Sequence, residues 1–198
     1  MQIKKQVEEY QTRIMDNYND CSTKNYLKYG CIFCKTGKEN SVAEAIESME
    51  GIVRARAVKQ TKRYTQRGIV SLEDHIVIKG YVFFEANEKV AFQNLLLIEG
   101  FLSVLTDGTG DWCLGGDDLT YAKIVMKYDG IIGLSKVYKI GDDIQIVEGP
   151  LKDFEGQITK IDKRNRSGQV TLNFNNQLKK VWLCFDIIQK PIADKHDV

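Results

Sequence analysis

The stretch YGCIFCKTGKENSVAEAIESMEGIVRARAV, residues 29–58, decides the fold. Tyr29–Cys34 is a short apolar run of strand length, and Ser41 with Glu44 has the spacing of a capping box that opens a helix. The apolar positions of this helix fall on one face: Val42, Ala45, Ile46 and Met49. Ile52–Val58 follows as a second strand, so the stretch predicts a β-α-β unit.

A second unit of the same kind follows. Lys59–Asp74 is polar and basic, and it is long enough for an extended hairpin arm or a mobile loop. A strand at Ile76–Glu85, a helix over 87–98 and a strand at Phe101–Thr106 then repeat the pattern, and Asp117 starts a last helix. Two such units predict an α+β domain, a ferredoxin-like split βαβ sandwich whose helices cover one face of a mainly antiparallel sheet.

The C-terminal part has a different sequence pattern. It consists of short β-branched segments separated by turn residues, at Asp143–Val147, Gly156–Asp162, Gln169–Phe174 and Lys180–Leu183. This pattern predicts a small β-barrel. The expected organisation is an extension over 1–25, whose apolar residues have helical spacing, an N-terminal domain over 26–130, a linker over 131–140, a β domain over 141–190 and a tail over 191–198.

Composition narrows the class of protein. The 198 residues carry 28 Lys and Arg against 27 Asp and Glu, with 43% apolar residues, which excludes a disordered chain and a globally basic surface. Any basic binding surface must be local. Met1–Tyr10 is polar and no long apolar run follows, so we expect a cytoplasmic protein with no membrane partner. Five scattered cysteines predict reduced thiols.

The sequence offers no catalytic constellation. The only histidines, His75 and His196, fall in a loop and near the C-terminus, away from any candidate nucleophile. Cys31 and Cys34 lie three residues apart on a predicted strand, which places their side chains on opposite faces of the sheet. We therefore expect a protein that is not an enzyme and that holds neither a metal nor another cofactor.

Aromatic residues and local charge remain as candidate sites. Phe33, Tyr81, Phe83 and Phe84 lie on the two central strands, and spacing alone leaves open whether they are core or form an exposed face. Residues 150–190 carry eight Lys and Arg against four Asp and Glu. The cations concentrate in Lys163–Arg166 and at Lys179–Lys180, where they either contact phosphates or form a solvated surface.

Three segments together resemble a known family. Tyr29–Glu39 resembles the opening strand and turn of the NusG N-terminal domain, Lys79–Phe83 resembles its Gly-Tyr strand, and Gly141–Gly156 resembles the start of a KOW domain. In this order they cover about residues 29–190. The resemblance implies a transcription elongation factor with an N-terminal domain of the NusG type and a five-stranded, SH3-like KOW barrel.

The resemblance also implies partners and site residues for the N-terminal domain. Docking on the clamp helices of RNA polymerase would use the positions that match the family's apolar patch, Phe33, Ile78, Tyr81 and Phe83. A nucleic-acid contact, with non-template DNA as the candidate, would use the following turn, Lys35, Thr36 and Lys38. Lys79 stands where the family has proline, and Glu99 stands where the specialised member RfaH has arginine, which favours a specialised paralogue.

The tail domain most resembles that of LoaP, an antiterminator that recognises an RNA hairpin in the nascent transcript. This resemblance implies a monomer that binds RNA through the cations and the amide of its KOW domain, Lys152, Lys163, Arg164, Asn165, Arg166, Lys179 and Lys180. The alternative is a general elongation factor whose KOW domain bridges to a ribosomal protein or a termination factor. Its apolar contacts would come from Phe154, Trp182 and Phe185.

Overall fold

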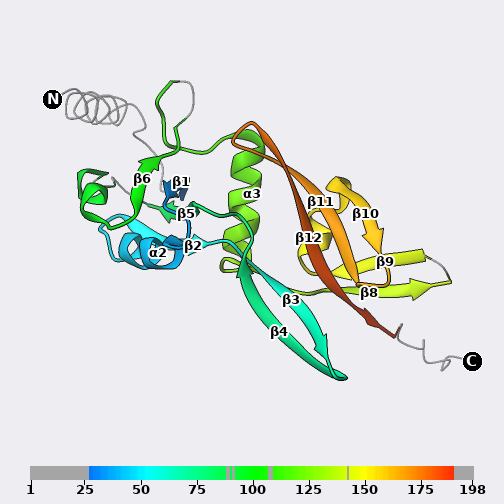
Figure 1. The fold of residues 1–198 in the computed structure, drawn as a ribbon. Coiled ribbons are helices and arrows are strands. Elements are labelled where there is room, and N and C mark those ends of the chain that lie inside the picture. Colours follow the sequence, from blue (N-terminus) through cyan, green and yellow to red (C-terminus); the bar gives the residue numbers. More distant parts are fainter. Residues whose placement is uncertain (1–26, 88–89, 91, 107–108, 142, 190–198) are drawn as a thin grey trace, which may run out of the picture. The chain divides into compact units, whose positions relative to one another are not determined.

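The computed structural model describes residues 27–87, 90, 92–106, 109–141 and 143–189 (Figure 1). The extension over 1–25, with its expected helix, lies outside these residues, and so does the tail over 191–198. The chain divides into two compact units. Unit 1 runs to Lys59 and resumes over Ile76–Ile131, and unit 2 comprises Gln60–His75 and the residues from Ile132 onward. No helix within the described ranges is long and apolar enough to span a membrane.

Unit 1 is built on a four-stranded sheet. Its strands are β1 (Lys28–Cys34), β2 (Ile52–Ala57), β5 (Tyr81–Ala86) and β6 (Phe101–Val104) (Figure 1). The order is β2-β5-β1-β6, and every neighbouring pair is antiparallel. Helix α2 (Glu39–Glu47) connects β1 to β2, and the 3-10 helix η2 (Phe92–Leu97) lies between β5 and β6. This order and pairing agree with the predicted split βαβ arrangement.

The main core of unit 1 lies between this sheet and α2. Alternate residues of β1 and β5 point to this side because successive strand residues face opposite sides of a sheet. They pack with the apolar face of α2 in a cluster that includes Ile32, Cys34, Val82, Phe84, Val42 and Ile46. Trp112 joins the cluster and stacks on Phe84 with ring centroids 5.4 Å apart.

Helix α3 (Gly116–Lys127) packs against β1 and β5 on the other face of the sheet. Phe83 is fully buried there, and its ring meets the ring of Tyr121 edge-on at 5.4 Å. Arg54 also fixes the helix, because its guanidinium binds the buried Glu85 carboxylate at 2.7 Å and donates to the Met126 carbonyl at 3.3 Å. The expectation that helices cover only one face is therefore wrong.

Three predicted boundaries in unit 1 also change. Helix α2 begins at Glu39, two residues before the expected capping box, and the Ser41 hydroxyl donates back to the Lys38 carbonyl instead of capping. The expected helix over 87–98 is a 3-10 helix over Phe92–Leu97. The third sheet strand begins at Tyr81, because the residues up to Ile76 belong to a separate hairpin.

That hairpin belongs to unit 2. Strands β3 (Lys59–Gln66) and β4 (Ile69–Ile76) are joined through Arg67 and Gly68, whose φ angles are 51° and 79°. Positive φ at both central residues is the geometry of a tight two-residue hairpin turn. With β7 (Ile131–Ile132) they form a sheet in the order β4-β3-β7. Of the two predicted forms of this stretch, the structure has the hairpin arm.

The body of unit 2 is a five-stranded sheet in the order β10-β11-β12-β8-β9. Its strands are β8 (Ser135–Ile140), β9 (Asp143–Glu148), β10 (Ile158–Asp162), β11 (Ser167–Phe174) and β12 (Gln177–Ile188). Helix α4 (Pro150–Asp153) and the 3-10 helix η3 (Glu155–Gln157) lie between β9 and β10. The predicted strand segments are all present, and closure of the sheet into a barrel stays a prediction.

The expected linker over 131–140 is wrong. It contains β8, which pairs in parallel with the end of β12, Phe185 lying opposite Ser135, and antiparallel with β9. Val137 of β8 is fully buried, as is Phe185 of β12, so these residues belong to the core of the sheet. Unit 2 therefore takes up the chain again at Ile132 rather than at Gly141.

Candidate protein and nucleic-acid interfaces

An aromatic pair, Phe33 of β1 and Tyr81 of β5, lies at the surface of unit 1. The two residues are opposite each other in the antiparallel register, and their ring centroids are 5.2 Å apart. Phe33 is 38% exposed and Tyr81 is half-buried. Cys31 and Phe83 lie on the same face, each two positions further along its strand, and both are fully buried. The pair therefore marks the end of this sheet face that α3 leaves open.

Only part of the expected apolar patch is on this surface. Phe83 lies against Tyr121 beneath α3, and Ile78 is only 3% exposed. Neither side chain can contact a partner in this conformation, so the four-residue patch is corrected to the aromatic pair. The sequence pattern did place Phe83 on the same sheet face as Tyr81, but the position of α3 over that face is a tertiary feature that periodicity does not report.

Gly80 and Glu39 shape the loops beside the aromatic pair. Gly80 has a φ of 81°, and a side chain there would lie 3.1 Å from the Phe33 ring, so only glycine permits this close approach. The Glu39 carboxylate is 3% exposed and accepts the Gly80 N–H and the Gly37 N–H, both at 2.8 Å. The loops before β5 and after β1 are thereby held together by one side chain that the sequence analysis missed.

The turn after β1 presents the residues expected to contact nucleic acid. Lys35 and Thr36 are exposed, and the Lys35 N–H donates to the Gly100 carbonyl at 2.8 Å. The Lys38 ammonium lies 2.8 Å from the Glu99 carboxylate, which it holds at a pKa below the usual value for a glutamate. Lys38 is therefore engaged within the unit, and Lys35 is the more accessible cation of this turn.

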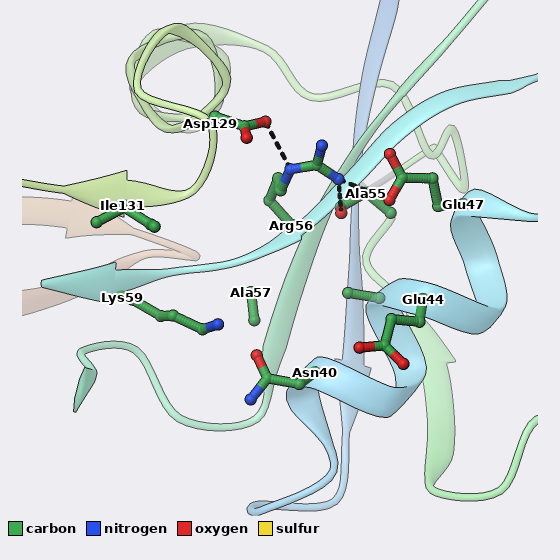
Figure 2. Close-up of a pocket in the computed structure, with 10 residues that line it drawn as sticks. Asn40, Glu44, Glu47, Ala55, Arg56, Ala57, Lys59, Asp129 and Ile131 are labelled. Atoms are coloured by element: carbon green, nitrogen blue, oxygen red, sulfur yellow. Dashed lines mark hydrogen bonds and ion pairs between the residues drawn. The ribbon is translucent and has the colours of Figure 1, made fainter. Parts of the chain in front are cut away.

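A polar pocket of about 230 Å³ lies elsewhere in unit 1, between α2, β2 and the residues that follow α3 (Figure 2). Arg56 reaches between Glu47 and Asp129, with nitrogen to oxygen distances of 2.7 and 2.6 Å. These carboxylates raise the pKa of the Arg56 guanidinium. Because the pocket's arginine is satisfied by two carboxylates of the unit itself, we interpret the pocket as an ion-paired contact between elements and not as a ligand site.

The basic turn, Lys163–Arg166, connects β10 to β11 in unit 2, and all four of its residues are exposed. Asp162 braces it: its carboxylate accepts the Asn165 backbone N–H at 2.9 Å and the Asn165 side-chain amide at 2.8 Å. These hydrogen bonds hold the pKa of Asp162 below its usual value. Asn165, expected to contact RNA, therefore uses its side-chain amide to shape the turn.

An acidic residue of β12 faces the same turn. The Asp186 carboxylate binds Arg63 of the β3–β4 hairpin and lies 4.0 Å from the Arg166 guanidinium. Arg166 thus shares its partner with Arg63, and part of its charge is offset within the unit. Lys163 and Arg164 of the turn are exposed and contribute to its positive charge.

The other expected RNA-binding residues lie in two further places. Lys152 is in α4, where its ammonium lies 2.5 Å from Glu155, and its neighbour Leu151 packs against Gly168 at the start of β11. Lys179 and Lys180 lie toward the far end of the β11–β12 hairpin. Ser167 pairs with Cys184 whereas Thr171 pairs with Lys180, so about 13 Å of strand separates this lysine pair from the basic turn.

The apolar residues expected to contact a protein partner are mostly inaccessible. Phe154 and Phe185 are 2% and 1% exposed and belong to the core of unit 2. Trp182 is half-buried. Two of the three expected contacts are thus removed from the surface, which is a correction to that alternative.

The cysteine pair behaves as predicted. Cys34 belongs to the core beside α2, whereas Cys31 lies on the opposite face of the sheet, and both are buried. Burial raises the pKa of the Cys34 thiol to about 11 and also raises the pKa of the Cys31 thiol. Across the described ranges, no three or more His, Cys, Asp or Glu side chains are grouped as they would be to hold a metal ion.

Comparison with known proteins finds likenesses among solved structures. The chain is similar to a structure described as "Domain interaction in Thermotoga maritima NusG", with 18% sequence identity and a TM-score of 0.45. The match covers 80% of this chain and 94% of that chain. No family model and no curated protein matches the sequence. A likeness at this level establishes neither the family nor the function.

Proposed function

We propose that this protein is a specialised transcription antitermination factor of the NusG type, which binds RNA polymerase through unit 1 and a hairpin in the nascent RNA through unit 2. The observation that carries the proposal is the exposed aromatic pair. Phe33 and Tyr81 lie on strands whose next residues on the same face are fully buried. The three motifs that resemble NusG and KOW segments, in their order along the chain, supply the identity of the partner.

The chemistry of the aromatic pair suits a protein partner. Aromatic side chains that are apolar, rigid and partly exposed are common anchors of protein interfaces. The pair is bordered by the exposed Lys79, next to Gly80, and by the exposed Lys35 after β1. An apolar centre with cations at its rim fits an apolar surface that carries acidic residues. The clamp helices of RNA polymerase, implied by the motif resemblance, are the proposed occupant.

Unit 2 offers the chemistry for RNA. The basic turn is exposed, and the Asp162–Asn165 hydrogen bonds keep Lys163 and Arg164 on a defined loop. Lysine and arginine neutralise RNA phosphates and follow the shape of an A-form stem. RNA captured in this way would recruit the factor to particular transcripts while unit 1 stays on the polymerase. The activity is binding without turnover, exerted in the cytoplasm by a monomer.

The proposal is tested with the full-length chain and purified RNA polymerase core enzyme. Phe33→Asp and Tyr81→Asp place a charge in the apolar centre and should abolish co-elution with the polymerase. The matched control is Leu97→Asp, which changes an 86% exposed leucine of η2 in the same unit. Circular dichroism must show that all three variants are folded. Retained polymerase binding by a folded Tyr81→Asp variant would refute the role of the pair.

The general adaptor function, in which unit 2 binds a protein, has less support. Phe154 and Phe185 are in the core, so two of the three apolar contacts expected for such a partner are not at the surface. The exposed apolar residues of unit 2 lie elsewhere, chiefly at Ile69, Val70 and Leu72 of β4 and at Leu178. The basic turn gathers exposed cations on one loop. These cations favour RNA as the ligand of unit 2.

A further inference from the structure

The outer face of the β10–β11–β12 sheet carries an aromatic residue among polar ones. Val181, Leu183 and Phe185 of β12 are buried, so the alternate residues, including Lys180 and Trp182, face outward. Trp182 is half-buried rather than core. Among the described residues, no hydrogen bond, ring contact or ion pair involves its side chain. A tryptophan that is half-buried at a surface usually has a partner for its ring or its N–H.

The strand register surrounds Trp182 with groups that can bind a nucleotide. Gln169 lies opposite Trp182, and Lys160 lies opposite Gln169, so these three residues form one row across three strands. In the next row Lys180 lies opposite Thr171. Residues opposite each other on one face of a sheet have Cβ atoms about 5 Å apart. A ring, an amide and two cations therefore share one outer surface.

The hydrogen bonds on this surface hold its polar part in place. The Thr159 hydroxyl lies 3.3 Å from the Gln169 side-chain oxygen and 3.5 Å from the Thr171 hydroxyl. These contacts hold the side chain of Gln169, the residue opposite Trp182 in the register. Lys160, at the end of the row, and Lys180, in the next row, are both exposed. This surface is cationic and open, and an aromatic ring lies at the end of its row.

We propose that Trp182 is a stacking platform for an unpaired RNA base, with Lys160 and Lys180 binding the flanking phosphates and Gln169 hydrogen-bonding the base edge. This inference rests on the proposed function, since it names the part of the RNA that unit 2 binds in addition to the stem. Aromatic stacking with adjacent cations is a common way to bind single-stranded nucleic acid, because every base has a flat face. Positive charge favours RNA over an apolar protein surface as the occupant.

The platform and the basic turn would then bind different parts of one RNA. The turn lies near the Ser167–Cys184 pair, and the row of Trp182 begins two residues further along the hairpin at Gln169. The two sites are thus adjacent on one hairpin. A stem contacted by the turn would continue into a loop whose bases reach the platform.

Tryptophan fluorescence of the full-length chain tests the platform. The chain has two tryptophans, and Trp112 is buried in unit 1 against Phe84 and Phe92. The probes are an RNA hairpin with an unpaired loop and the blunt duplex of the same stem. We expect the hairpin to quench the fluorescence, the duplex to quench it less, and the hairpin-induced quenching to disappear in Trp182→Phe. Trp182→Phe should still bind the hairpin, because phenylalanine also stacks.

Affinity provides the second readout. Trp182→Leu should weaken hairpin binding roughly tenfold, as loss of one base stack does. Tyr138→Leu, which changes a half-buried aromatic residue of β8 in the same sheet, should leave it unchanged. Thermal melting must show that both variants are folded. Hairpin binding that is unchanged in Trp182→Leu, with no quenching in the wild type, would overturn the platform while the proposed function stands. Absence of RNA binding by the wild type would overturn both, and binding of a protein in place of RNA would favour the adaptor function.

Discussion

At the scale of single residues, Glu39 is central to the order of unit 1. It opens α2, and its carboxylate accepts two backbone N–H groups from loops on either side of the aromatic pair. Buried N–H groups lose hydration on folding and need an acceptor. The geometry around Phe33 therefore depends on the Glu39 carboxylate, which accepts the Gly80 N–H.

Glu39→Ala should lower the free energy of unfolding by about 2 kcal/mol, because it leaves the buried Gly80 N–H without its acceptor. The measurement is urea unfolding of the full-length chain. Glu44→Ala is the matched control, since Glu44 is an exposed residue of the same helix. Equal unfolding midpoints for the two variants would show that the Glu39 carboxylate is not needed.

The thiols of Cys31 and Cys34 provide a second prediction at this scale. The pKa of Cys34, about 11, leaves almost no thiolate at neutral pH, and burial also raises the pKa of Cys31. Iodoacetamide at neutral pH should therefore leave both unmodified in the folded protein and modify both in guanidinium chloride, as read by peptide mass spectrometry. The half-buried Cys184 is the internal reference. Rapid labelling of Cys34 in the folded protein would contradict its placement in the core.

At the scale of elements, the basic turn is a loop whose shape is set by its own anion. Asp162 accepts two hydrogen bonds from Asn165, and so it holds the loop that carries Lys163 and Arg164. Because the pKa of Asp162 is lowered in the folded state, its contribution to stability is present above its usual value of 3.8 and is lost as the pH falls through the lower, folded-state value. The turn therefore remains braced at neutral pH.

Asp162→Ala should speed hydrogen exchange of the Asn165 amide at neutral pH, because that amide loses its acceptor. Exchange is followed residue by residue by NMR. Asp143→Ala, which changes an exposed aspartate at the start of β9, should leave the Asn165 amide unaffected. Slow exchange of this amide in Asp162→Ala would show that the carboxylate does not shape the turn.

Elements differ in how far the sequence predicts them. Strands β1, β2 and β6 were predicted to within two residues, because alternating or continuous apolar runs bounded by glycine are local signals. The start of α2 was missed because Ser41 and Glu44 match a capping pattern, whereas the helix begins at Glu39 without a side-chain cap and the Ser41 hydroxyl donates back to Lys38. Strand β8 was missed because its pairing with β12 joins residues about fifty positions apart, which no local pattern reports.

At the scale of the whole molecule, the sequence predicted two domains with different surface chemistry. It predicted only some residues of the candidate site. The pattern placed Phe33 and Tyr81 on one sheet face with Phe83, but it could not say how far α3 would cover that face. It found the basic turn because charge is visible in sequence. It did not find that Arg166 shares Asp186 with Arg63, since those residues lie on three separate strands or turns.

Unit 1 and unit 2 present independent chemistries, an aromatic pair and a cationic hairpin. Their variants should therefore separate the two activities: Phe33→Asp should lose the polymerase and keep RNA, and changes in the basic turn should do the reverse. Sites that share no residue are expected to act independently when they do not contact each other. The claim that distinguishes this factor from a general adaptor is that unit 2 captures RNA through phosphates.

A salt titration of RNA binding by the full-length chain tests that claim most directly. Fluorescence anisotropy with a labelled RNA hairpin should show affinity that falls steeply as salt rises. Replacing Lys163, Arg164 and Arg166 together by alanine should weaken binding and reduce the slope of log affinity against log salt by about 2. Replacing Lys136 and Lys139 of β8 should change neither value. A wild-type affinity that is weak or independent of salt, or a slope that the triple variant leaves unchanged, would contradict RNA capture by the basic turn.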